Sequence, residues 1–261
     1  MAFGTALSYN GHDLQTADIQ TADIDHFSGP TKNQAIYGVG HANYSAIPFL
    51  NFPSKTIVVT GRLVGDTIEQ LDDLIDTFKG YFTGNGKYLD VGYSSSTRRY
   101  VCTPQSPQIQ RPNGLLKTNF SVTFDCTLPF GRNTTATTAL NATARTGHLY
   151  ADNHVFVGSA PWQYPVTVIT FHTITGGTNA TVVLGNNANG QQTTLTRTWA
   201  SGDVIEASSD PFNRYVKING TPFDWAGALC EFEKDSQYIA YSDTFTTVNF
   251  DINVSYYPMW M

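Results

Sequence analysis

The chain has 261 residues and a net charge of −6, and only 14% of its residues are charged, where about 25% is usual for a soluble protein. Aromatic residues make up 13%, which excludes a disordered chain, because disorder needs high charge and few aromatic side chains. The acidic balance excludes a basic groove for nucleic-acid phosphates. No apolar run reaches the roughly 18 residues of a membrane span, so we expect no membrane insertion.

Strand-like segments separated by Gly and Asn turns fill most of the first half. The clearest is Asn119–Leu128, in which Phe120, Val122 and Phe124 alternate with polar residues. Alternation of this length predicts a strand with one buried face. The other candidates in this half are Phe3–Tyr9, Ile19–Phe27, Thr56–Val64, Lys87–Tyr93 and Arg98–Thr103.

One helix is predicted within this β pattern, at about residues 67–82. Asp66 and Glu69 have the spacing of a capping box. Apolar residues then recur three or four positions apart, as on one face of a helix, at Ile68, Leu71, Leu74, Ile75, Phe78 and Phe82. We expect this face to pack on the first sheet, with Asp72, Asp73 and Asp76 on the solvated side.

An irregular arm, Ser28–Pro53, lies between the second and third strand candidates. A loop of about 25 residues in a compact domain is usually functional or makes contacts outside its own fold. We therefore expect subunit or partner contacts from this arm, through Pro30, Tyr37, Tyr44, Phe49 and Phe52. The apolar, uncharged C-terminal segment would be an aggregation hazard in water, so we expect it, with Trp260, to be buried in its own domain or against a partner.

The segment Gly131–Gly147 is small, polar and without periodicity, which predicts a linker at 133–147. It separates residues 1–132 from residues 148–261, and the second part shows only strand patterns. Its closing strand, Thr247–Tyr256, alternates like Asn119–Leu128. The further candidates are His148–Val157, Tyr164–Thr173, Ala180–Leu184, Gln192–Thr198, Asp203–Ala207, Tyr215–Asn219 and Tyr238–Tyr241. We predict a mainly β chain of two β-sandwich domains, the first with one packed α-helix.

Residue patterns for catalysis are weak. No nucleophile elbow, phosphate-binding loop or metalloprotease motif occurs. Glu231 and Glu233 would share one face of a strand, as acid and base do in some glycosidases, but acidic residues also protect sheet edges from pairing. Cys102, Cys126 and Cys230 fit no zinc pattern and are expected to be reduced. We predict no enzyme, no metal and no cofactor.

Two tryptophans leave an alternative function open. Exposed aromatic rings on a β-sandwich stack on sugars, and Trp199 and Trp225 are candidates for such positions. Packing in a core explains the same residues. The alternative is therefore a carbohydrate-binding module.

The order of segments resembles a known family. TIVVTGRLVGD leads into IEQLDDLIDTFKGYF, then KYLDVGY and TRRYVCTPQ, and a long strand ends in Pro129-Phe130. This resembles the N-terminal domain of siphophage distal tail proteins. SAPWQYPVTVITF, GDVIEASS, YVKING and FDWAG resemble the galectin-like C-terminal domain of the same family.

The resemblance implies a structural virion protein. It implies a homohexameric ring at the distal end of a long non-contractile tail, formed by the first domain around a channel through which DNA passes as cargo. The expected partners are the tail tube protein on one side and the tail-associated hub, fibre or receptor-binding protein on the other. The protein would be made in the host cytoplasm and would function in the virion.

Overall fold

A computed structural model describes residues 6–25, 33–34, 50–51, 54–93, 96–110, 114–186, 189–211, 213–233 and 236–260. The chain divides into two compact units, one ending at Thr134 and the other running from Thr135 to Trp260. None of the helices in these parts of the chain has the length and apolarity to cross a bilayer.

Unit 1 is built on one antiparallel sheet with the strand order β2-β1-β7-β8-β10-β6-β3. Its longest ladder joins β10 to β6, from Lys117 opposite Val64 to Cys126 opposite Lys55. The strands are β1 (Leu7–Tyr9), β2 (His12–Asp13), β3 (Ile19–Asp25), β6 (Lys55–Val64), β7 (Lys87–Gly92), β8 (Thr97–Pro104) and β10 (Lys117–Cys126). The short strand β9 (Gln108–Gln110) pairs with β10, and β11 (Gly131–Asn133) pairs with β8. A separate two-stranded sheet joins β4 (Asn33–Gln34) to β5 (Leu50–Asn51).

The helix of unit 1, α1, runs from Ile68 to Tyr81, and its N-cap is Thr67 rather than the predicted Asp66. The Thr67 hydroxyl accepts a hydrogen bond from the Gln70 amide at 3.2 Å, and the Gln70 side chain accepts one from the Asp66 amide at 3.1 Å. The cap thus lies one residue later than predicted, and the Gln70 side chain reaches back to the amide that precedes the cap rather than to the Thr67 amide, which a standard capping box would use. A hydroxyl and a carboxylate both cap helices, so the spacing alone did not distinguish the two positions.

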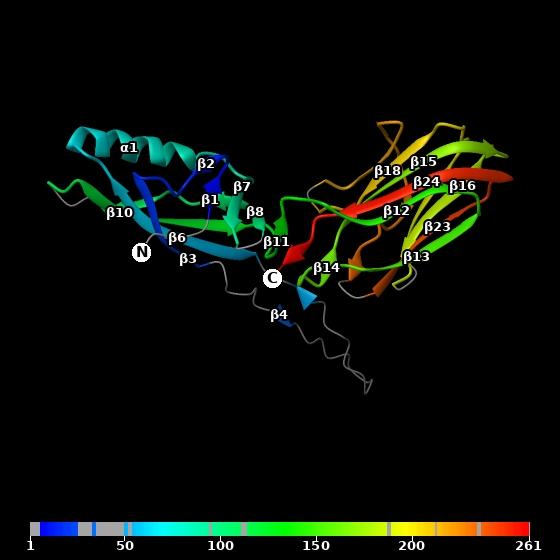
Figure 1. The fold of residues 1–261 in the computed structure, drawn as a ribbon, viewed down its shortest axis with the longest axis horizontal. Coiled ribbons are helices and arrows are strands. Elements are labelled where there is room, and N and C mark those ends of the chain that lie inside the picture. The colour runs from blue at the N-terminus through cyan, green and yellow to red at the C-terminus, as the bar shows by residue number, and fades with distance from the viewer. Residues whose placement is uncertain are drawn as a thin grey trace, which may run out of the picture. The chain divides into compact units, whose positions relative to one another are not determined.

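The helix covers one face of the sheet, as predicted (Figure 1). Leu71, Ile75 and Phe78 are buried against it, and the Phe78 ring lies 4.7 Å from that of Phe120 on β10. Gly61 on β6 makes room for this contact, because a Cβ atom there would lie 2.6 Å from Phe120. Ile68 was predicted on the apolar face but is 48% exposed, at the first helical position.

The described part of unit 2 contains two large antiparallel sheets and one two-stranded sheet. The six-stranded sheet has the order β12 (Thr137–Arg145), β24 (Thr247–Tyr256), β15 (Pro165–Thr175), β18 (Val204–Ser208), β19 (Tyr215–Ile218) and β20 (Thr221–Pro222). The five-stranded sheet has the order β13 (Leu149–Val155), β23 (Ser236–Asp243), β16 (Ala180–Asn186), β17 (Gln191–Arg197) and β21 (Ala226–Gly227). The strand β14 (Trp162–Gln163) pairs with β22 (Phe232–Glu233), and β25 is Met259–Trp260.

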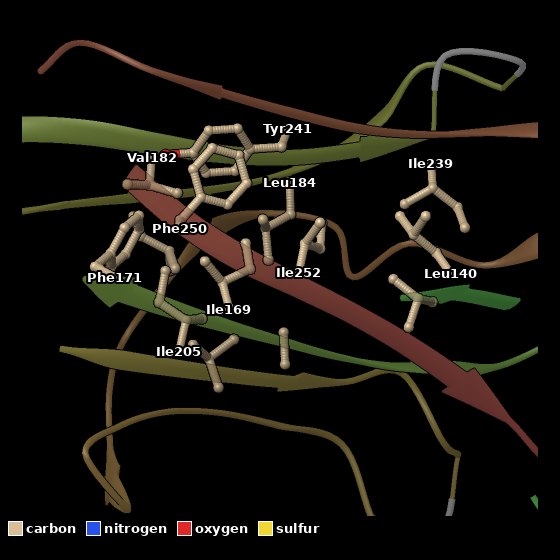
Figure 2. Close-up of a cluster of buried hydrophobic side chains, with 14 of the residues drawn as sticks. Leu140, Ile169, Phe171, Val182, Leu184, Ile205, Ile239, Tyr241, Phe250 and Ile252 are labelled. Atoms are coloured by element: carbon tan, nitrogen blue, oxygen red, sulfur yellow. The ribbon is translucent and has the colours of Figure 1, made fainter. Parts of the chain in front are cut away.

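Side chains from both sheets fill one core between them (Figure 2). Ile169, Phe171 and Ile252 come from the six-stranded sheet, and Val182 and Leu184 from the five-stranded sheet. The alternation predicted for Thr247–Tyr256 is observed, since every second residue of β24 is buried. The prediction of a mainly β fold is confirmed.

The prediction of a linker over residues 133–147 is wrong for most of that range. Thr137–Arg145 forms β12, which pairs with β24 and contributes Leu140 and Ala142 to the core. The register shifts between Thr138 and Leu140, and again between Ala142 and Arg145. These irregularities break the two-residue period, and the small Thr and Ala side chains give little hydrophobic signal, so the pattern read as a loop.

Candidate interaction surfaces

Of the two glutamates that were weighed as an acid and a base, Glu231 is held in structural contacts and Glu233 is exposed. The Glu231 carboxylate forms an ion pair with Arg214, and the Glu231 amide donates to the Gln191 side chain at 2.6 Å. Glu233 lies on β22, opposite Trp162 on β14, and is exposed. Among the described residues, no group of three His, Cys, Asp or Glu side chains is placed to hold a metal ion.

The predicted sugar-facing tryptophans lie in different environments. Trp199 is 4% exposed, and its indole N–H donates to the Ala180 carbonyl at 2.9 Å. A buried ring has no face for a sugar, so of the two alternatives for Trp199 the sugar-facing one is wrong and core packing is observed. Trp225 is 39% exposed. Tryptophan suits either position because it combines a large apolar ring with one donor.

The outward face of the five-stranded sheet in unit 2 carries no charged side chain among its described residues. Val182, Leu184 and Ile239 point into the core, so the residues between them point outward. The strand register then places Leu149 opposite Ser242, Ala151 opposite Ala240, and Ala240 opposite Gly185. We call this the uncharged face; it consists of Leu149, Ala151, Asn153, Val155, Thr181, Val183, Gly185, Gln192, Thr194, Thr196, Ala226, Tyr238, Ala240 and Ser242.

A trough of about 450 Å³ lies over the uncharged face. Its lining includes the small residues Ala151, Gly185, Ala240 and Ser242. Leu149, which also lines it, is 82% exposed. On a soluble protein, exposed apolar residues gathered on one surface mark an interaction site.

The outward face of the other sheet in unit 2 is different. Glu206 lies opposite Lys217 across β18 and β19, and Asp251 accepts from His172 at 3.0 Å. The Asp251 carboxylate also accepts from the Ala144 amide at 2.8 Å, and this bond and His172 together lower the pKa of Asp251. Charged pairs therefore occupy one outer face of unit 2, whereas the described residues of the other face have none.

Unit 1 has a hydroxyl-rich face on the side of its sheet away from α1. Thr60 lies opposite Ser121, and Val58 lies opposite Thr123. We call these residues, together with Thr56 and Thr103, the hydroxyl face. Asp125 lies between Thr56 and Thr103 on the same side and accepts a hydrogen bond from the Thr56 hydroxyl at 3.4 Å. Beside it, Arg99 makes two 2.7 Å hydrogen bonds to Asp90, and its guanidinium lies 4.5 Å from the ring of Tyr88.

A groove of about 470 Å³ lies on the helix side of unit 1, between α1 and the segment around β9. Asp72, Asp76, Lys79 and Ile109 line it. Asp76 and Lys79 form an exposed ion pair of 3.3 Å. Such an exposed pair contributes little to stability, and it fits the prediction that the polar side of the helix is solvated.

The residues predicted to make subunit or partner contacts fall largely outside the described part of the chain. Pro30, Tyr37, Tyr44, Phe49 and Phe52 lie there. Trp260 on β25 is partly buried, next to Met259, whose amide donates to the buried Gln163 side chain at 2.9 Å. The role of Trp260 in a partner contact stays a prediction.

No protein-family model and no curated protein matches the sequence. Among solved structures, the crystal structure of the SPP1 Dit (gp 19.1) protein superposes over 99% of this chain and 100% of its own, with a TM-score of 0.69 and 12% sequence identity. The chain has the fold of the SPP1 Dit protein. That protein is described as a paradigm of the hub adsorption apparatus in phages that infect Gram-positive bacteria. Two structures of the phage p2 baseplate in its activated conformation, with Sr and with Ca, match over 96% of this chain and 97% of their own, each with 9% identity and a TM-score of 0.49.

Proposed function

We propose that this chain is a structural protein of the phage tail tip, which forms a hexameric ring joining the tail tube to the receptor-binding apparatus. The observation that carries the proposal is the match to SPP1 Dit, because it extends over 99% of one chain and 100% of the other. A match that included only one unit would support no more than a shared domain. The proposal places the protein in the virion, at the distal end of the tail, after synthesis in the host cytoplasm.

Unit 1 is the proposed ring-forming part. Its hydroxyl face suits a wet, polar contact, since interfaces commonly contain bridging water. The net charge of −6 per copy makes the assembled ring acidic. Like-charge repulsion then keeps DNA from adhering while it passes through the channel. The arm predicted from the sequence, with Pro30, Tyr37, Tyr44, Phe49 and Phe52, would reach a neighbouring subunit.

Unit 2 is the proposed docking part, and the uncharged face is the proposed docking surface. The cores of protein interfaces are depleted of charged side chains. An uncharged sheet in an acidic chain therefore suits a protein partner better than an ionic ligand. The proposed occupant is the adjoining hub, fibre or receptor-binding protein. The alternative of a carbohydrate-binding module loses Trp199, which is buried, and would depend on the exposed Trp225 alone.

The ring is tested by the mass and the shape of the purified full-length protein. Light scattering after size-exclusion chromatography is expected to give about six times the 28.7 kDa of one chain. Negative-stain electron microscopy is expected to show rings with a central hole. A monomer at every concentration, with no ring in the images, would contradict the proposed function.

A further inference from the structure

Two cysteines face each other in the core of unit 1. Cys102 on β8 lies directly opposite Cys126 on β10. Both side chains are 0% exposed, and their sulfur atoms are 2.8 Å apart. Both cysteines are free thiols in this structure.

The hydrogen bonds around the pair define its backbone geometry. The Thr127 amide donates to the Val101 carbonyl at 2.9 Å, and the Gln105 amide donates to the Thr123 carbonyl at 2.7 Å. Bonded and non-bonded pairs alternate along an antiparallel ladder, so Cys102 and Cys126 form a non-hydrogen-bonded pair. The Cα atoms of such pairs are about 4.5 Å apart, which lies within the range of about 4.4–6.8 Å that a disulfide spans.

The pair also lies in a short ladder of the unit 1 sheet, the one between β8 and β10, which we call the β8–β10 seam. The ladder between β8 and β10 consists of Phe124–Pro104, Asp125–Thr103 and Cys126–Cys102, whereas the ladder between β10 and β6 continues along all of β10. The β8–β10 seam joins the strands β2, β1, β7 and β8 to the strands β10, β6 and β3. A covalent link between β8 and β10 would hold these two halves of the sheet together.

We propose that Cys102 and Cys126 form a cross-strand disulfide when the protein meets an oxidising, disulfide-containing medium. One thiol, as its thiolate, attacks a low-molecular-weight disulfide such as oxidised glutathione and releases one reduced glutathione. The second thiolate then attacks the mixed disulfide, which forms the Cys102–Cys126 bond and releases the other reduced glutathione. The two cysteines lose two electrons and two protons, and the small disulfide is reduced to two thiols. This modification site does not depend on the proposed function.

The burial of both thiols determines under which conditions the disulfide forms quickly. It raises the pKa of Cys102, so the folded protein holds little of the reactive thiolate there. The bond should therefore form during folding, or by slow opening of the native state. Cys230 in unit 2 is an internal control, since its sulfur contacts the Leu184 and Gln191 carbonyls and its pKa is raised by burial to about 12.

The experiment refolds the full-length protein from denaturant in glutathione buffers of increasing oxidised fraction. Free thiols are then blocked with N-ethylmaleimide in denaturant, and the intact mass is measured. The wild type is expected to pass from three adducts to one, with a chain lighter by two hydrogen atoms. Cys230→Ser should pass from two adducts to none, and Cys102→Ser should never lose the two hydrogens.

Thermal unfolding supplies a second measurement. Oxidised wild type and oxidised Cys230→Ser are expected to unfold several degrees above their reduced forms, and Cys102→Ser is expected to show no difference. Three adducts in every buffer, or glutathione attached to single cysteines in place of an internal bond, would overturn the proposal. A disulfide from Cys230 to either of the other cysteines would overturn it as well.

Discussion

At the scale of single residues, His154 is a group in unit 2 whose surroundings predict a pH effect on stability. Its ring meets Phe156 edge-on at 4.9 Å and lies 6.0 Å from Tyr256. Its Nε2 atom is buried and makes no hydrogen bond within the described part of the chain. Burial lowers the pKa of His154 below its ordinary value of 6.5, and the Asp152 carboxylate opposes this shift only in part.

The sign of the pH effect follows from that shift. The unfolded chain binds a proton at His154 near pH 6.5, whereas the folded chain binds it only at lower pH. The stabilisation from neutral His154 is therefore complete above pH 6.5 and is lost as the pH falls toward the folded-state pKa. Proton NMR of the imidazole is expected to give a midpoint below 6.5. His154→Phe should lose less stability than the wild type between pH 7.5 and 5.5 in urea titrations; a midpoint above 6.5 would contradict the account.

The sequence predicts residue environments well where alternation is strict. It gave the buried faces of Asn119–Leu128 and Thr247–Tyr256, because each polar residue is bracketed by apolar ones. It did not separate Trp199 from Trp225, because a single tryptophan carries no periodicity. The sequence also did not predict that Cys102 and Cys126 lie opposite each other, because the register of two strands depends on contacts that the local pattern does not contain.

At the scale of elements, the cap of α1 allows a direct test of the structure against the sequence pattern. Thr67→Ala removes the hydroxyl that accepts the Gln70 amide, so it is expected to reduce the free energy of unfolding by about 1 kcal/mol. Asp66→Ala keeps the backbone amide that donates to Gln70 and should cost much less. Urea unfolding of the two variants, followed by far-UV circular dichroism, measures both. A larger loss for Asp66→Ala would restore the originally predicted capping box.

The helix α1 could be predicted from its own sequence, whereas the strand β12 could not. The predicted helix, at about 67–82, differs from Ile68–Tyr81 by one residue at each end, because its apolar spacing extends over the whole element. β12 gave no such signal. Ala144 in this strand has a positive φ of 52°, and its amide is held by the Asp251 carboxylate, 107 positions later in the chain. A strand shaped by a distant partner cannot be recognised from its own composition.

At the scale of the whole molecule, the mainly β class follows from composition and periodicity, but the uncharged face does not. That face is assembled from β13, β23, β16, β17 and β21, whose order in the sheet differs from their order in the chain. Each strand alone shows only a few small or polar residues. The lack of charge becomes visible once Ala151, Ala240 and Gly185 are aligned by the strand register.

The proposed docking role of the uncharged face is tested with one introduced charge. Ala240→Glu places a carboxylate in the trough, where a protein partner would have to bury it without a counter-ion. Burying an unpaired charge is costly, so docking should fail although the fold is kept. Asn253→Glu is the matched control, since Asn253 lies opposite Asn141 on the other sheet and faces away from its core.

Both variants are expected to keep the melting temperature and the oligomeric mass of the wild type, because each charge is added on an outer face. Each is then supplied in trans to phage that lack the wild-type gene, and the released particles are imaged and titred. Ala240→Glu is expected to give tails without the receptor-binding apparatus and a titre at least tenfold below that of Asn253→Glu, about the factor that a loss of 1.4 kcal/mol in binding produces. Equal titres and complete tail tips in both would show that the partner docks elsewhere. The ring would remain supported in that case, because it is measured separately by mass and by imaging of the purified protein.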